Sequence, residues 1–246
     1  FNPNYEPFKK KEVRQAINYA IDAKLIIDRL LKGKAYPAVG YLPSTSPAFD
    51  PKAKGYEYNV EKAKALMKQA GYEQGFTFEC IGTSNEAWGI PVVEALMPFL
   101  KAINVTVKPQ QVEGAALAPR LQKLDYQAFI WSVSSGAGGD SLQALARWES
   151  KNPPTAGNFV TYNNPEFDKL LEAARKERDA AKRNDILRKA DAIFKDDAPI
   201  WFFNYNKAAI AHQPWVKGIK PVAIEMMYQD LTDLWIDEAS PRAKEK

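Results

Sequence analysis

The chain has 246 residues, of which 46% are hydrophobic and 12% aromatic, enough to bury the core of one large domain or two small ones. Its 34 basic and 30 acidic residues give a net charge of +4 without forming one basic stripe, which disfavours a nucleic-acid partner. One cysteine excludes an intramolecular disulfide, and one cysteine with one histidine disfavours a His/Cys metal site. No stretch is long and apolar enough to resemble a membrane span.

The first seventy residues predict helices on either side of a long irregular segment. Asp22 is a good N-cap between two apolar stripes, so residues 11–31 should form two consecutive helices. Residues 34–59 lack periodicity and are rich in proline and glycine, which is typical of a segment that is functional or wraps a surface. Asn59 should cap a further helix that stops at Gly71.

The next part of the chain predicts an α/β layer. Residues 76–80 and 105–107 alternate between apolar and polar, as strands do, and helices are expected over about 90–103 and 117–124. The segment from Tyr126 to Val133 is apolar on both faces, which is typical of a central strand in a covered parallel sheet. The predicted fold class is therefore α/β, with a mixed sheet and flanking helices.

The last hundred residues predict helices followed by strands. A short helix is expected at 140–147, and Asn164, Pro165 and Glu166 form a clear start for the first of two antiparallel helices. Residues 199–203 and 208–211 are expected to pair as strands. The tail from Trp215 to Asp237 has strand-like pieces without an obvious partner.

The loop after the third predicted strand is the best candidate for a ligand site. It consists almost entirely of serine, glycine and alanine, and ligands of parallel sheets collect beyond the carboxyl ends of strands. Trp131 is either core or a pocket wall, and Trp88 follows another strand at the same edge of the sheet. The predicted ligand-binding residues are Trp131, Ser132, Ser134, Ser135, Asp140, Asn85 and Trp88.

Little in the sequence indicates catalysis, so we expect no enzymatic activity, no cofactor and no metal. The sequence has no G-x-S-x-G nucleophile elbow for which His212 could act as a base. Cys80 lies on an apolar strand face and should be a small buried hydrophobe. The enzyme alternative is a hydrolase using Glu86, Asp140 or Glu149 as acid and base. A third alternative is a chaperone-like module that binds extended segments along residues 34–59.

Several motifs together resemble one family. They include Val13–Asp22 (VRQAINYAID), Gly40-x-Leu42-Pro43 and Glu61–Leu66 (EKAKAL), then Asp125-Tyr126 leading to Trp131, and Tyr162-x-Asn164-Pro165-Glu166. In this order the chain is similar to the extracytoplasmic solute-binding proteins of the dipeptide/oligopeptide family, family 5, which supply ABC importers. The matches run from about residue 7 to residue 218.

The resemblance implies that the chain is the carboxyl-terminal half of a two-lobed, periplasmic-binding-protein-like protein. Residues 1–214 would form the second, ligand-enclosing lobe, and the tail, 215–246, would return to the missing amino-terminal lobe of the same protein. The lobes of relatives close around a ligand, and the ABC permease in the membrane recognises the closed form. The location implied is periplasmic or on the cell surface.

The resemblance also bears on the ligand. Peptide-binding relatives commonly have an aspartate three residues after the tryptophan that matches Trp131, and it pairs with the amino terminus of the peptide. Here that position is Ser134, although Asp140 could take over the charge. A buried ammonium group needs such a partner. The missing aspartate therefore weakens the case for a peptide with a free amine and favours other ligands of the family, such as an oligosaccharide or an opine-like compound. A small peptide is still the first expectation, and these ligands are the alternative.

Overall fold

The computed structural model describes residues 1–83, 89–132, 140–207, 209–220 and 231–241. The chain begins with α1 (Glu6–Lys9), α2 (Lys11–Ala20), α3 (Ala23–Arg29), β1 (Ala35–Pro37) and α4 (Val60–Gln69). A strand and helix layer follows, with β2 (Phe76–Gly82), α5 (Ile90–Lys101), β3 (Val105–Gln111), α6 (Gly114–Gln122) and β4 (Ala128–Phe129). The rest comprises α7 (Ser141–Ala146), η2 (Pro154–Ala156), α8 (Pro165–Lys176), α9 (Ala180–Asp197), β5 (Asn204–Asn206), β6 (Val216–Lys217) and β7 (Trp235–Ile236).

The helix starts that the sequence predicts are confirmed by their caps. The Asp22 carboxylate accepts a hydrogen bond of 2.9 Å from the backbone nitrogen of Leu25, at the start of α3. Asn59 and Asn164 cap α4 and α8 in the same way. These side chains satisfy backbone N–H groups that have no partner within the helix, which is why the helices begin at these residues.

The parallel sheet has the strand order β3-β2-β4. The prediction of a central strand over Tyr126–Val133 is wrong in the described part of the chain, because β2 lies in the middle and β4 lies at an edge. β4 pairs with β2 only at Cys80↔Ala128 and Ile81↔Phe129, and β2 ends one residue later, so the ladder stops there. Tyr126 is buried by packing with Ile81 and residues of α6 and the loop after η2, not by a central place in the sheet.

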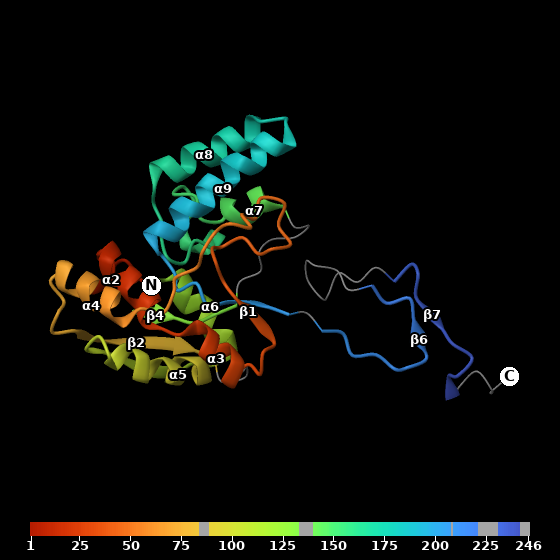
Figure 1. The fold of residues 1–246 in the computed structure, drawn as a ribbon, viewed down its shortest axis with the longest axis horizontal. Coiled ribbons are helices and arrows are strands. Elements are labelled where there is room, and N and C mark those ends of the chain that lie inside the picture. Colours follow the sequence, from red (N-terminus) through yellow and green to blue (C-terminus); the bar gives the residue numbers. More distant parts are fainter. Residues whose placement is uncertain (84–88, 133–139, 208, 221–230, 242–246) are drawn as a thin grey trace.

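The two faces of the sheet pack against different groups of residues. Phe78 and Cys80 of β2 belong to a large apolar core with α2, α4 and α5, and the expectation that Cys80 is a buried hydrophobe is confirmed. Ile81, which points to the other face, packs against Leu117 and Leu121 of α6. A separate core joins α7, α8 and α9 to the irregular segment after β1. Helices α8 and α9 lie side by side (Figure 1).

The expected pairing of residues 199–203 with residues 208–211 is wrong for the described residues. β5 begins at Asn204 and pairs antiparallel with β1 instead. The backbone just before β5 bonds to side chains of α2. Arg14 donates to the carbonyl oxygens of Asp197 and Ala198, while the Asn18 amide donates to Ile200 and accepts from the Phe202 nitrogen. These contacts occupy backbone groups that a hairpin would need.

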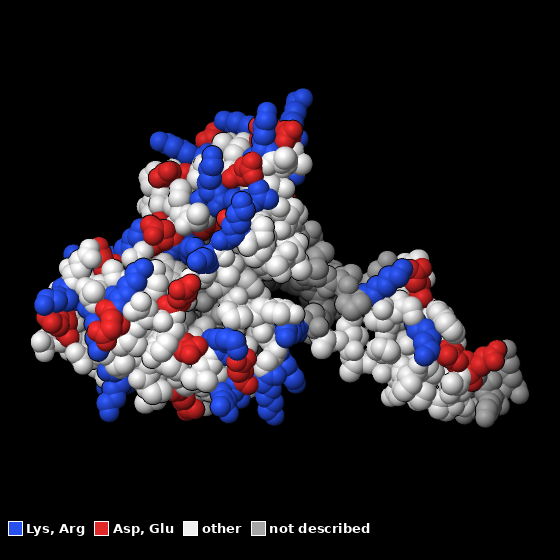
Figure 2. Space-filling model, in the orientation of Figure 1, with Lys and Arg blue, Asp and Glu red and all other residues white. Residues whose placement is uncertain are grey.

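The strand-like pieces of the tail pair with each other. β6 and β7 form an antiparallel ribbon through Val216↔Ile236 and Lys217↔Trp235. Figure 1 shows this ribbon standing away from the rest of the chain, at the end of an extended linker. On the face that Figure 2 shows, lysine and arginine side chains are interspersed with aspartate and glutamate.

Candidate functional site

The carboxyl ends of β2 and β4 form one edge of the sheet, where the sequence places the ligand site. The Ile130 nitrogen donates to the Ile81 carbonyl oxygen over 3.0 Å, so the two strands stay together to this edge. Gly82, the last residue of β2, allows the close approach. A Cβ atom there would lie 2.7 Å from a methyl carbon of Ile130. The glycine at this position therefore reflects close packing between the strands.

Trp131 lies two residues after β4 and packs against Phe159. Its ring lies 5.5 Å from that of Phe159, at an interplanar angle of 39°. Phe159 is buried, and its carbonyl oxygen accepts a hydrogen bond from the Tyr126 hydroxyl. The burial and the hydrogen bond hold the phenyl ring on which the Trp131 indole packs. The tryptophan itself is 38% exposed. A ring with one supported face and one exposed part suits stacking on a ligand better than a core position.

Asp140 lies at the start of α7, and a neighbouring segment holds that start in place. Its carboxylate caps the helix by accepting from the Leu142 nitrogen over 2.9 Å. The next residue, Ser141, is buried, and its hydroxyl lies 2.5 Å from that of Ser46 and accepts from the Ala48 nitrogen over 3.2 Å. The irregular segment thus fixes the helix start. No sequence pattern indicated this contact, because the two serines are far apart in the chain.

The predicted site residues fall into two groups. Trp131, Ser132 and Asp140 are described and exposed, and no hydrogen bond or ion pair joins these three. Asn85, Trp88, Ser134 and Ser135 lie outside the described residues. Trp131 and Ser132 are neighbours in the chain beyond β4. Asp140 is the first described residue after them and lies at the start of α7.

The acids of the hydrolase alternative have structural partners where they are described. Glu149 is 5% exposed and receives bonds of 2.7 and 2.6 Å from the guanidinium of Arg175. Burial by itself raises the pKa of Glu149, but the bonds and charge of Arg175 outweigh it and hold the pKa below its ordinary value. Asp140 caps α7, and Glu86 lies outside the described residues. A carboxylate locked in this way is poorly suited to proton transfer.

Other reactive groups are isolated. His212 is exposed, with Nδ1 3.0 Å from the carbonyl oxygen of Gln213. Burial raises the pKa of the Cys80 thiol to about 12, which disfavours the reactive thiolate. Within the described ranges there is no group of three or more His, Cys, Asp or Glu side chains that could hold a metal ion. No described helix is long and apolar enough to cross a membrane.

Known proteins resemble this chain over most of its length. Heme-binding protein A of Haemophilus influenzae is 31% identical over 230 residues, and the glutathione-binding protein GsiB of Pectobacterium atrosepticum is 32% identical over 214 residues. These alignments cover 89% and 82% of the chain but 40% of each relative. The chain therefore spans well under half the length of these two proteins.

Solved structures share the fold over the same extent. DppA of Helicobacter pylori, in complex with the peptide STSA, matches with a TM-score of 0.81 and 27% identity over 96% of this chain and 46% of its own. AgaA of A. tumefaciens R10, in complex with agropinic acid, matches with a TM-score of 0.76 and 27% identity over 84% of this chain and 42% of its own. The α/β fold that the sequence predicts is thus that of periplasmic binding proteins.

The sequence model of one family covers more than half of the chain. It is described as the middle part of the bacterial extracellular solute-binding proteins, family 5, and it matches residues 1–156, which include the sheet and the supported Trp131. The chain belongs to the family 5 bacterial extracellular solute-binding proteins.

Proposed function

We propose that the protein containing this chain captures a small peptide or a related solute between two lobes and delivers it to a membrane permease, as the substrate-binding component of an ABC importer. The observation that carries this proposal is family membership together with the half-exposed Trp131 at the carboxyl edge of the sheet. The peptide bound to the similar DppA supports a peptide ligand. The proposed location is the periplasm or the cell surface.

Trp131 would form one wall of the ligand site. Its support by Phe159 means that the ring needs no reordering when a ligand stacks on it, which reduces the entropic cost of binding. Ser132 would contribute a hydroxyl group, and Asp140 an anchor for a cationic group. Ser134, Ser135, Asn85 and Trp88 complete the proposed site and rest on the sequence alone.

An oligosaccharide or opine-like ligand is the second candidate. The specific observation in its favour is Ser134, which stands where the resemblance to peptide-binding relatives predicts an aspartate. The agropinic acid bound to AgaA, at the same sequence identity as DppA, supports this alternative. A ligand without a free amine would not leave an ammonium group unpaired.

We infer that residues 1–214 form the ligand-enclosing lobe and that the tail, 215–246, packs against the first lobe. Leu231, Trp235 and Ile236 are 63%, 56% and 55% exposed, which is unusual for large apolar side chains so close together. Relatives are more than twice as long as this chain, so they contain polypeptide that could cover the ribbon. The quenching of Trp235 fluorescence by acrylamide should therefore be weaker in a two-lobed protein than in this chain.

The proposal is tested on the full-length protein. Mass spectrometry of the compound that copurifies with it identifies the ligand class, and calorimetry with peptide, oligosaccharide and opine-like panels measures the affinity. We expect one ligand for each protein and a closed form by small-angle scattering. Absence of binding across all panels would refute the transport function. Tight binding of unfolded chains without competition from small molecules would favour the chaperone-like alternative.

A further inference from the structure

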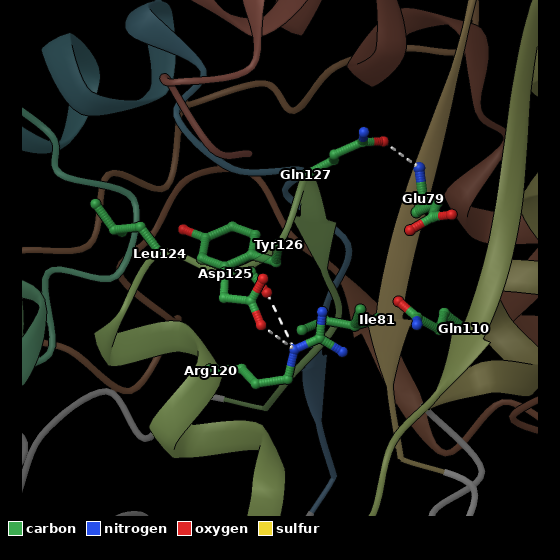
Figure 3. Close-up of a pocket in the computed structure, with 8 residues that line it drawn as sticks. All are labelled: Glu79, Ile81, Gln110, Arg120, Leu124, Asp125, Tyr126 and Gln127. Atoms are coloured by element: carbon green, nitrogen blue, oxygen red, sulfur yellow. Dashed lines mark hydrogen bonds and ion pairs between the residues drawn. The ribbon is translucent and has the colours of Figure 1, made fainter.

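A polar surface pocket of about 310 Å³ lies on the face of the sheet that α6 covers only in part. Its walls come from β2, β3, α6 and the turn that leads into β4 (Figure 3). Gln127, on one wall, precedes β4, whereas Trp131 follows it. None of the residues that line the pocket is one of the proposed solute-site residues. The pocket is at the lower end of the range of about 300–1,000 Å³ for ligand pockets, so its ligand must be small.

Arg120 presents a fixed guanidinium group to this pocket. Its Nε atom donates to the backbone oxygen of Asp125 over 3.1 Å and to the carboxylate over 2.9 Å. The side chain is only 26% exposed, and among the described residues no atom accepts a hydrogen bond from either Nη group. Figure 3 shows these groups directed from α6 toward the strands that carry Ile81 and Gln110. Nη donors that have no partner in the described chain can bind an external acceptor.

Glu79, on β2, supplies the opposite charge. Its backbone nitrogen donates to the Gln127 side-chain oxygen over 2.6 Å, which orients that carboxamide, and no described residue accepts a hydrogen bond from its NH₂ group. Within the described chain, the Glu79 carboxylate and the Gln110 carboxamide have no hydrogen bond or ion pair. The pocket therefore offers the exposed Glu79 carboxylate and the two Nη groups of Arg120, whose Nε atom pairs with Asp125, together with the carboxamides of Gln110 and Gln127. Ile81, Leu124 and the ring of Tyr126 add apolar surface.

We propose that this pocket binds a small zwitterion of the α-amino acid class. The ligand carboxylate accepts hydrogen bonds from the two Nη groups of Arg120, a geometry that guanidinium groups favour. The ligand ammonium pairs with Glu79, and a short apolar side chain lies against Leu124. A simple carboxylate would make no contact with the exposed Glu79 carboxylate, and a simple cation would make none with the Nη donors of Arg120. A zwitterion satisfies both.

The test is an NMR or calorimetric titration of the full chain with L-leucine, N-acetyl-L-leucine and L-leucinamide. We expect saturable 1:1 binding of leucine and binding of the two blocked compounds that is weaker by about tenfold or more, because each lacks one charge-assisted contact. Equal binding of all three compounds, or no saturable binding of leucine, would overturn the proposal.

Variants locate the binding. Glu79→Gln removes a carboxylate that has no partner in the described chain, so the fold should persist while leucine affinity falls about tenfold. Arg120→Lys keeps the positive charge but loses the paired donors and should weaken binding similarly. Glu94→Gln, an exposed site on α5, is the matched control and should bind normally. Trp131→Ala should also leave leucine binding unchanged, and loss of binding in that variant would overturn the proposal by placing leucine in the solute site.

Discussion

Asp191 on α9 should make the stability of this chain fall as pH rises. Its carboxylate accepts from the Tyr41 nitrogen over 2.9 Å and packs against Gly40, where a Cβ atom would lie 2.5 Å from a carboxylate oxygen. Burial raises the pKa of Asp191 from 3.8 to about 6, although the backbone N–H groups of Tyr41 and Leu42 oppose the rise. The folded chain therefore binds a proton here more tightly than the unfolded chain does.

The sign and size of the effect follow from this difference. A group with a raised folded-state pKa contributes stability that is fully present below pH 3.8 and is lost as pH rises through about 6. Because one pKa unit corresponds to about 1.4 kcal/mol, the full effect is about 3 kcal/mol, and partial exposure of the side chain reduces it to about 2. Asp191→Asn removes the titration.

Urea unfolding at about pH 4 and about pH 8 measures the difference. Any cost of the new amide is the same at both pH values. The difference in free energy of unfolding between the variant and the parent should therefore shift by about 2 kcal/mol in favour of the variant from about pH 4 to about pH 8. Asp185→Asn is the matched control, because Asp185 lies on the same helix and is exposed beside Arg188. Parallel pH profiles for the parent and Asp191→Asn would show that folding does not raise the pKa of Asp191.

Three further substitutions or labelling experiments test the packing. Arg175→Gln removes the guanidinium that pairs with the buried Glu149 and leaves the ammonium group of Lys151, 3.5 Å away. The free energy of unfolding should fall by about 2–4 kcal/mol near pH 7 and by less at about pH 4, where the glutamate can protonate. An equal fall at both pH values in urea unfolding would contradict this. Cys80 should react with a thiol reagent only after unfolding, and rapid labelling of the native chain would show that its burial is wrong. Gly75→Ala puts a Cβ atom 1.7 Å from a backbone oxygen and should lower the free energy of unfolding by about 3 kcal/mol or more. Gly71→Ala, with a similar positive φ and no atom within 4 Å of the new Cβ, should lower it by about 1 kcal/mol. Similar melting temperatures for the two variants would contradict the packing.

Features fixed by neighbouring residues could be predicted from the sequence. A helix cap depends only on the capping residue and on the first turn of the helix after it. The predicted caps at Asp22, Asn59 and Asn164 are all confirmed. Cys80 was correctly placed in the core because period-two alternation identifies a strand face.

Features fixed by distant parts of the chain could not be predicted. β5 pairs with β1 because Arg14 and Asn18 hold the backbone before it. β4 pairs with β2 at only two positions, Cys80↔Ala128 and Ile81↔Phe129, which the residues of β4 do not reveal. In the same way, the sequence predicted Trp131 within a strand, whereas it lies beyond the end of β4, and its contact with Phe159 could not be predicted.

Trp131→Ala in the full-length protein tests whether the residues beyond β4 form a wall of the solute site. Tyr58→Ala is the matched control, because Tyr58 is an aromatic residue that is 49% exposed and packs on Phe99. The affinity for the copurified ligand, measured by calorimetry, should fall about tenfold or more in Trp131→Ala and stay unchanged in Tyr58→Ala. Unchanged affinity in a folded Trp131→Ala protein would contradict the account.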